Sequence, residues 1–342
     1  MSMEKTIEKK SLADIRKEVL KNFSGFNYTR YYLRIAIFSL LFFSVSYITL
    51  LSANTLGWSF FVIGTIGLFL SFHMIAFFIM HGASHNLARN KKVSSFFLLI
   101  SSVILDINTF RWADKHKKIH HPYNGMGDKD IDIQYQAGCL RLSEKQSLKK
   151  MHRFQHIYYL PILGFPIFFE KFFYGFKKSL VFPDEKRDIK KVIATKLVHY
   201  ALFVFFPLFA YSFYAVLIYY LLFNFVTGFF VYLLLIIGHA KSEVLYGEEE
   251  KKYDSLTRQL LCTTNFSADS WFFTMLTNGV NLHVEHHLLP SEPIPMLKAM
   301  RKLLLLHYPE TYHSYPTVFS AVYDQLCFLK RLGREPKCSF DV

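Results

Sequence analysis

Histidine is the residue type whose arrangement in this sequence most clearly suggests chemistry. Fifteen histidines occur, and nine of them form the motifs HxxxH and HxxxHH, a lone histidine, and the motif HxxHH. The nine are His81, His85, His116, His120, His121, His239, His283, His286 and His287. Residues three or four positions apart lie on one face of a helix, so each motif can direct two imidazoles at one metal ion.

Two of the motifs end in adjacent histidines, at 120–121 and 286–287. Neighbouring helical residues point about 100° apart, which suits two metal ions better than one. Imidazole binds zinc, copper, iron and nickel alike, so the ligand type does not select the metal. A catalytic zinc usually takes three protein ligands. Nine histidines fit two redox metals that each keep an open position, and we expect such a pair to activate O2.

Two long apolar runs must position these motifs. No Asp, Glu, Lys or Arg occurs between Arg34 and Arg89, or between Lys196 and Lys241. A membrane-spanning helix needs about 20 apolar residues, so each run can hold two spans. The predicted spans are 35–53, 57–80, 197–213 and 215–238. We therefore expect an all-α polytopic membrane protein with four transmembrane helices in two hairpins.

Charge orients this topology. The two predicted hairpin tips hold no Lys or Arg, so all 40 basic residues fall on the other side. The positive-inside rule then places both termini and the central loop in the cytosol. All four histidine stretches would lie at that membrane boundary, where unliganded imidazoles are costly to bury. We expect a cytosolic helical cap that holds a di-metal site, and we assign the net charge of +14 to the membrane surface rather than to nucleic acid.

Two shorter apolar segments are less decisive. The segment 93–105 is too short to span and is predicted as an interfacial or re-entrant helix. The segment 157–173 is interrupted by prolines and is predicted to lie on the membrane surface, although both segments could equally be core helices of the cap. The four cysteines (139, 262, 327 and 338) are widely spaced and are expected to be free thiols of a reducing compartment. The polar N-terminus lacks the apolar stretch of a secretory signal.

The order of the histidine motifs resembles that of the membrane fatty acid desaturase and hydroxylase superfamily. The resemblance extends from about Arg34 to Pro295, and includes Trp112 and the acidic stretch 128–132 on either side of the second motif, as well as the run 259–277 that leads to the last motif. The ending His-Val-Glu-His-His-Leu-Leu-Pro at 283–290 is similar to the EHHLFP ending of front-end and bacterial acyl-lipid desaturases. That branch usually has Gln where this chain has His283, and other branches have His there.

The resemblance implies that all nine histidines bind two iron ions and that O2 is a co-substrate. The implied activity is desaturation of an acyl chain carried by CoA, a carrier protein or a lipid. Hydroxylation on the same site is the alternative, and a membrane zinc hydrolase is a rival from another class. The chain has no HPGG haem motif, so a separate electron donor of the ferredoxin or cytochrome b5 type is expected.

We expect the chain to be divided into three parts. These are a cytosolic N-terminal segment 1–32, a membrane desaturase domain 33–305 with cytosolic histidine regions 81–196 and 239–305, and a cytosolic tail 306–342. Carboxylates near the motifs are candidates to accept the second ring N–H of each ligand. They are Asp106, Asp114, Asp128, Asp130 and Glu285.

Two further groups of residues have weaker assignments. Lysines on the cytosolic face could bind a phosphate of the substrate or could simply be positive-inside charges. They are Lys115, Lys117, Lys118, Lys149 and Lys150. The six histidines outside the motifs, including His73 within the second predicted span, are expected to be packing or surface residues.

Overall fold

The computed structural model describes residues 9–130, 132–133, 136, 138–174, 189–239 and 252–334. The chain forms two compact units. Unit 1 comprises Met1–Asn27, Lys117–Tyr159 and Leu234–Val342, and unit 2 comprises Tyr28–His116 and Leu160–Leu233. Cys338 and the end of the predicted tail lie outside the described residues, while Cys139, Cys262 and Cys327 form no disulfide among the described residues.

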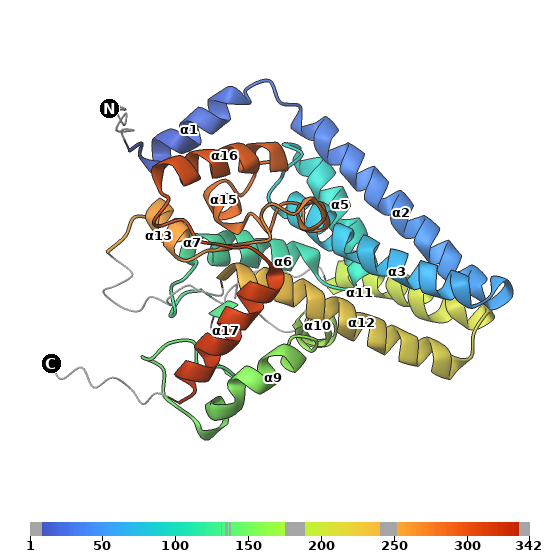
Figure 1. Cartoon of the computed structure of the whole chain (residues 1–342). Helices are drawn as coiled ribbons and strands as arrows, with labels where there is room; N and C mark the ends of the chain where they lie inside the picture. The colour runs from blue at the N-terminus through green and yellow to red at the C-terminus, as the bar shows by residue number, and fades with distance from the viewer. Residues whose placement is uncertain are drawn as a thin grey trace. The chain divides into compact units, whose positions relative to one another are not determined.

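The first hairpin of unit 2 consists of α2 (Tyr28–Leu56) and α3 (Trp58–Met74). The two helices lie side by side in Figure 1, and Gly57 makes the turn with a φ of 95° that favours glycine. A Cβ on Gly64 would stand 2.5 Å from the backbone nitrogen of Leu50. Small residues therefore allow these helices to pack closely, as is common between helices in membranes.

The first hairpin continues from α3 into the first histidine motif without a break. The π-helical segment η1 (Ile75–His81) and the short α4 (Gly82–Ser84) follow α3 directly. The second hairpin consists of α11 (Ile189–Tyr200), extended by η5 (Ala201–Phe205) and η6 (Phe206–Phe209), and α12 (Phe213–Ile236), extended by η7 (Ile237–His239).

Among the described residues, four helices are long and apolar enough to cross a membrane. They are Tyr28–Leu56, Trp58–Ser84, Ile189–Phe209 and Phe213–His239. The prediction of four spans in two hairpins is confirmed. The third helix begins at Ile189 rather than at 197, because lysines can extend along a helix side and keep their charged ends in polar surroundings. It ends at Phe209 rather than at 213, after Pro207 in the last turn.

Two shorter elements of unit 2 follow the first hairpin. The helix α5 (Lys91–Leu105) is capped at its start by Asn90. The helix α6 (Thr109–Lys115) follows, and the direction of the chain changes by 113° between them. Asp106 permits this bend in a left-handed conformation with a φ of 56°. The segment predicted at 93–105 therefore lies in the first helix of a bent pair of the kind found in broken spans and re-entrant loops.

The second short apolar segment is divided. It forms α9 (Gln155–Ile162), α10 (Pro166–Phe169) and η4 (Glu170–Tyr174). Pro161 lies inside α9, and Pro166 begins α10. Proline at the first helical position lacks only a hydrogen-bond donor that would have no helical partner, so it begins a helix readily.

Unit 1 is also helical. Its longest elements are α1 (Leu12–Asn22), α16 (Ile294–His307) and α17 (Val318–Leu332). The shorter elements are η3 (Lys150–Phe154), α13 (Ser255–Leu261), α14 (Trp271–Leu276) and α15 (His283–Leu288). Two-residue strands β1 (Asn265–Phe266) and β2 (Ser314–Tyr315) pair in parallel. This pairing connects the segment before α14 to the segment before α17.

Candidate metal centre

The first histidine group lies within unit 2 and consists of His81, His85 and His116, which we call the three-histidine cluster. Their rings are 4.9–5.0 Å apart between centroids, and one ligating atom of each lies within 4.8 Å of the others. The Nε2 atoms of His81 and His116 are 3.1 Å apart. Trp112 stacks on the His116 ring at 4.7 Å and 18°. The helix running through η1 and α4 thus brings the first motif to the end of α6.

The second group lies within unit 1, and we call it the six-histidine cluster. It consists of His120, His121, His239, His283, His286 and His287. The ring centroid of His239 lies 5.0 Å from that of His120, 4.5 Å from that of His283 and 5.1 Å from that of His287. The structure therefore brings the lone histidine into one group with members of the second and third motifs.

In three rings of the six-histidine cluster, the Nδ1 nitrogen lies against an oxygen that can only accept a hydrogen bond. The Nδ1 of His239 donates to the carbonyl of Cys262 at 3.2 Å, and that of His283 donates to the carbonyl of Val280 at 3.1 Å. The Nδ1 of His287 faces the amide oxygen of Gln259 at 2.8 Å. An acceptor at Nδ1 fixes the proton there, so the Nε2 of each neutral ring carries a lone pair.

These lone pairs face one another inside the cluster. The Nε2 atoms of His239 and His283 are 2.9 Å apart, although neither carries a proton in this tautomer. The Nε2 of His287 is buried and has no hydrogen-bond partner among the described residues. One ligating atom each of His120, His239 and His287 lies within 4.8 Å of the others. Converging lone pairs repel unless a cation lies between them, so this donor set fits a metal ion.

His120 has a carboxylate environment instead. Its Nδ1 lies 3.3 Å from an oxygen of Asp130 and 3.4 Å from one of Asp132. Asp130 also accepts the backbone N–H of Asp132 at 3.0 Å, which fixes its orientation. Asp130 was a predicted ring acceptor, and the structure places it in contact with the His120 ring. Asp132 belonged to the same acidic stretch, but no role was predicted for it.

Two other predicted ring acceptors were wrong. Glu285 lies between two ligand candidates in sequence, but it accepts hydrogen bonds from Asn265 at 2.8 Å and Tyr312 at 2.5 Å. Asp106 forms an ion pair with Lys196 at 2.8 Å. Residues 283, 286 and 287 lie on one face of the short helix α15, and residue 285 lies on another. This difference in direction explains why Glu285 bonds to Asn265 and Tyr312.

For Lys115 the sequence left phosphate binding and a positive-inside charge open as alternatives, and the structure does not place this lysine on the surface. Lys115 is buried and lies 3.9 Å from Glu170 in an ion pair. A lysine in that position compensates a buried carboxylate rather than projecting into solvent.

Gln259 is a residue of the site that was not singled out from the sequence. Its amide oxygen accepts from the His287 ring and from Asn124 at 2.9 Å, and its amide nitrogen donates to the backbone carbonyl of His121. The residue thus connects the second and third motifs from behind the rings. Its position in the stretch 259–277, which was part of the family resemblance, was the only signal in the sequence.

Burial sets the electrostatics of the cluster. It lowers the pKa of His287 well below its ordinary value, and the neighbouring rings lower that pKa further. Burial raises the pKa of Glu285, while its hydrogen bonds from Tyr312 and Asn265 oppose the shift. Neutral imidazole is the form that binds metal, so a low histidine pKa keeps the ring available as a ligand.

The fold and these clusters define a class of protein: a polytopic helical membrane protein with buried histidine groups able to hold metal ions. The sequence profile of the fatty acid desaturase family matches residues 56–319, and the chain belongs to that family. It is therefore an integral membrane protein.

Curated relatives show how far the similarity extends. The chain is 24% identical over 273 residues to an acyl-lipid (8-3)-desaturase from Physcomitrium patens, across 75% of this chain and 57% of the relative. It is 26% identical over 307 residues to an acyl-lipid (7-3)-desaturase from Rebecca salina, across 84% of this chain and 65% of the relative. For an sn-1 linoleoyl-lipid 6-desaturase from Synechocystis sp., identity is 23% over 293 residues and 80% of each chain. The chain thus spans less than two thirds of the first two relatives.

Proposed function

We propose that this protein is an O2-dependent desaturase that introduces a double bond into the acyl chain of a membrane lipid. The observation that carries the proposal is the pair of facing Nε2 atoms of His239 and His283, 2.9 Å apart in a cluster of neutral rings. The names of the relatives, each an acyl-lipid or linoleoyl-lipid desaturase, favour a lipid over a thioester substrate.

The proposed cofactor is a pair of iron ions held by all nine histidines. The chain passes from the three-histidine cluster to the six-histidine cluster between His116 and His120, the two ends of the short segment η2. The order of the nine histidines, which resembles that of the desaturase and hydroxylase superfamily, supports assigning both clusters to iron. When bound, the iron pair would supply the O2-dependent oxidation of a C–H bond, for which amino acid side chains have no equivalent.

The protein's own residues have two tasks in this proposal. Gln259, Asp130 and the carbonyls of Cys262 and Val280 hold the rings in the tautomer that presents Nε2. The apolar core of unit 1, which includes Val284 and Leu288 beside the ligand candidates, keeps water away from the site. A separate ferredoxin or cytochrome b5 type protein is the proposed electron donor.

Product analysis tests the activity. We would express the chain in a host of known lipid composition and profile the acyl chains by mass spectrometry. Wild type should yield a new double bond, and His239→Ala at matched expression should yield none. His156→Ala replaces a half-buried histidine outside the clusters and should retain activity. A hydroxylated chain as the sole product would favour the hydroxylase alternative, and unchanged product from His239→Ala would remove His239 from the ligand set.

We further propose that both termini and the histidine clusters face the cytosol and that Asn54 faces the opposite side. The distribution of lysine and arginine supports this orientation. Single cysteines introduced at Asn54 and Lys298 should react with a membrane-impermeant reagent from opposite sides of sealed vesicles. Reaction of Lys298→Cys only from the outer side would contradict the orientation.

A further inference from the structure

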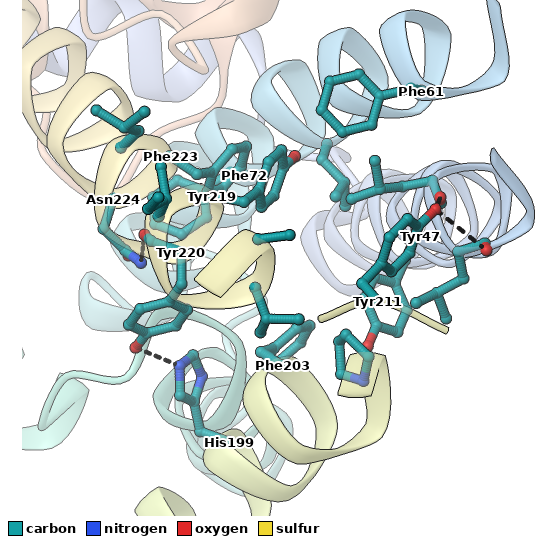
Figure 2. A pocket seen from close by; sticks show the side chains of 18 of the residues that line it. Tyr47, Phe61, Phe72, His199, Phe203, Tyr211, Tyr219, Tyr220, Phe223 and Asn224 are labelled. Atoms are coloured by element: carbon teal, nitrogen blue, oxygen red, sulfur yellow. Dashed lines mark hydrogen bonds between the residues drawn. The ribbon is translucent and has the colours of Figure 1, made fainter. Parts of the chain in front are cut away.

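A cavity of about 380 Å³ lies within unit 2, between its two hairpins (Figure 2). Its walls come from α2, α3, α12 and the helix that runs from α11 into η6, and Ile104 of α5 also lines it. One end reaches Tyr211, near the tip of the second hairpin, and the other end reaches His199 and Asn224. Most of the remaining lining is Phe, Leu, Ile and Val.

The tyrosines of the wall direct their hydroxyl groups at the protein. The hydroxyl of Tyr211 donates to the carbonyl of Leu50 at 2.9 Å, and that of Tyr47 donates to the carbonyl of Leu202. The hydroxyl of Tyr219 bonds to that of Thr65 at 3.3 Å. The rings therefore line the cavity while the polar ends are used elsewhere.

The polar residues at the inner end are bonded in the same way. The Nδ1 of His199 donates to the carbonyl of Val103 at 2.7 Å, so its Nε2 accepts from the hydroxyl of Tyr220 at 2.8 Å (Figure 2). The side-chain nitrogen of Asn224 donates to the backbone carbonyl of Tyr220 at 2.7 Å. Because these groups already form hydrogen bonds within the protein, the cavity suits a hydrocarbon chain better than a ligand that needs hydrogen bonds.

The wall formed by α12 opens to the surroundings of the hairpins. Ile218 and Leu222 both line the cavity, and their exposed fractions are 56% and 60%. They lie within a membrane-spanning helix, in the half nearer the hairpin tip, so the exposed side chains face lipid tails rather than water. A tail of a bilayer lipid can enter here sideways without carrying its head group into the membrane interior.

Position along α3 separates the cavity from the three-histidine cluster. Phe72 is the lining residue of this helix that is nearest to His81 in sequence, and a separation of nine positions corresponds to roughly 13 Å at the rise of an α-helix. Phe61, at the other end of the lining, is about 30 Å from His81 by the same rise per residue. We propose that the cavity binds one acyl tail of a phospholipid from the leaflet at the hairpin tips, as a bound lipid that is not oxidised.

Photocrosslinking tests this proposal and needs no turnover. The protein would be placed in nanodiscs of phosphatidylcholine that carries a diazirine in one acyl chain, irradiated, and mapped by peptide mass spectrometry. Wild type should give crosslinks on the lining segments of α2 and α12. Val216→Phe fills the cavity from a buried lining position, and Ile218→Trp blocks its exposed mouth with little risk to folding. Each should reduce these crosslinks roughly tenfold.

Val226→Phe is the matched control, because Val226 is exposed on the same helix and does not line the cavity. Its crosslinks on the lining segments should equal those of wild type. Equal crosslinking in all four proteins would show that lipid only coats the outer surface and would overturn the proposal. Recovery of the crosslinked chain with a new double bond, after incubation with reductant and O2, would also overturn it, because the occupant would then be the tail of the substrate.

Discussion

The six-histidine cluster of unit 1 and the cavity of unit 2 are both lined by aromatic rings that carry polar atoms, yet they suit opposite ligands. In the cluster, the Nδ1 atoms of His239 and His283 bond to the protein and their Nε2 atoms face each other. In the cavity, the hydroxyls of Tyr211 and Tyr219 bond to the protein and only ring carbons face the space. The difference is that each imidazole has a second nitrogen, which faces the cluster, whereas a tyrosine has no second polar atom to face the cavity.

The hydrogen-bond partners behind a lining residue therefore determine which of its atoms faces the space in front and can contact a ligand. Imidazole has two nitrogens, so satisfying one from behind leaves a lone pair available for a cation. Tyrosine has a single polar atom, so satisfying it leaves a hydrocarbon surface. Substitutions behind the lining should therefore affect the two regions very differently.

The largest effect is expected from Gly238→Ala. A Cβ at this position would lie 2.5 Å from two carbons of the His283 ring, close to the base of that side chain, so the ring must move. Displacing a ligand ring should remove bound metal and bring activity to background. Gly25→Ala is the control because a Cβ there meets no atom within 4 Å. Metal content and product formation would be measured on both variants. Wild-type metal content and product formation in Gly238→Ala would show that His283 is not a ligand.

A smaller loss is expected from Gln259→Leu, which keeps the side-chain size but removes the acceptor for His287 and the donor to the His121 carbonyl. Loss of such a partner typically lowers metal affinity by about 10–100-fold. Titration of the apo protein with Fe(II) measures this change. Gln325→Leu alters another buried glutamine of unit 1 and should leave affinity unchanged. The same affinity in both variants would mean that Gln259 does not orient the ring.

The smallest effect is expected from Tyr219→Phe, which removes a hydroxyl that bonds to Thr65 behind the cavity wall. The lost hydrogen bond should lower the free energy of unfolding by about 1 kcal/mol, and the lining surface should not change. Thermal melting in detergent and lipid crosslinking would be measured together. A large fall in crosslinking would show that this hydroxyl contacts the occupant, and the contrast between the two regions would then fail.

The sequence predicted the spans because charge-free length is a direct requirement of the bilayer. It also predicted that His239 would join the motifs, since a histidine that ends a span must lie at the membrane boundary. The ring partners were harder to predict. The acceptors for His239 and His283 are backbone carbonyls, and every residue has one, so residue type carries no signal for them.

The predictions of side-chain partners for the rings failed for a different reason. Glu285 and Asp106 were chosen for their proximity in sequence, but each is bonded within another network. Gln259, in contrast, is 28 residues from His287, and only the folded arrangement of α13 and α15 brings the two together. The cavity could not have been predicted at all, because Phe, Tyr and Leu in a span are equally typical of lipid-facing surfaces.

The most direct test of the metal assignment is the metal content of the purified protein after anaerobic reconstitution with Fe(II). We expect about two irons per chain, since nine histidines suit two ions that each keep an open position. His287→Ala removes a buried Nε2 that has no hydrogen-bond partner among the described residues. This variant should bind less iron than wild type at matched expression. Less than about one iron per chain in wild type, or zinc bound at one per chain, would show that the nine histidines do not hold a pair of iron ions.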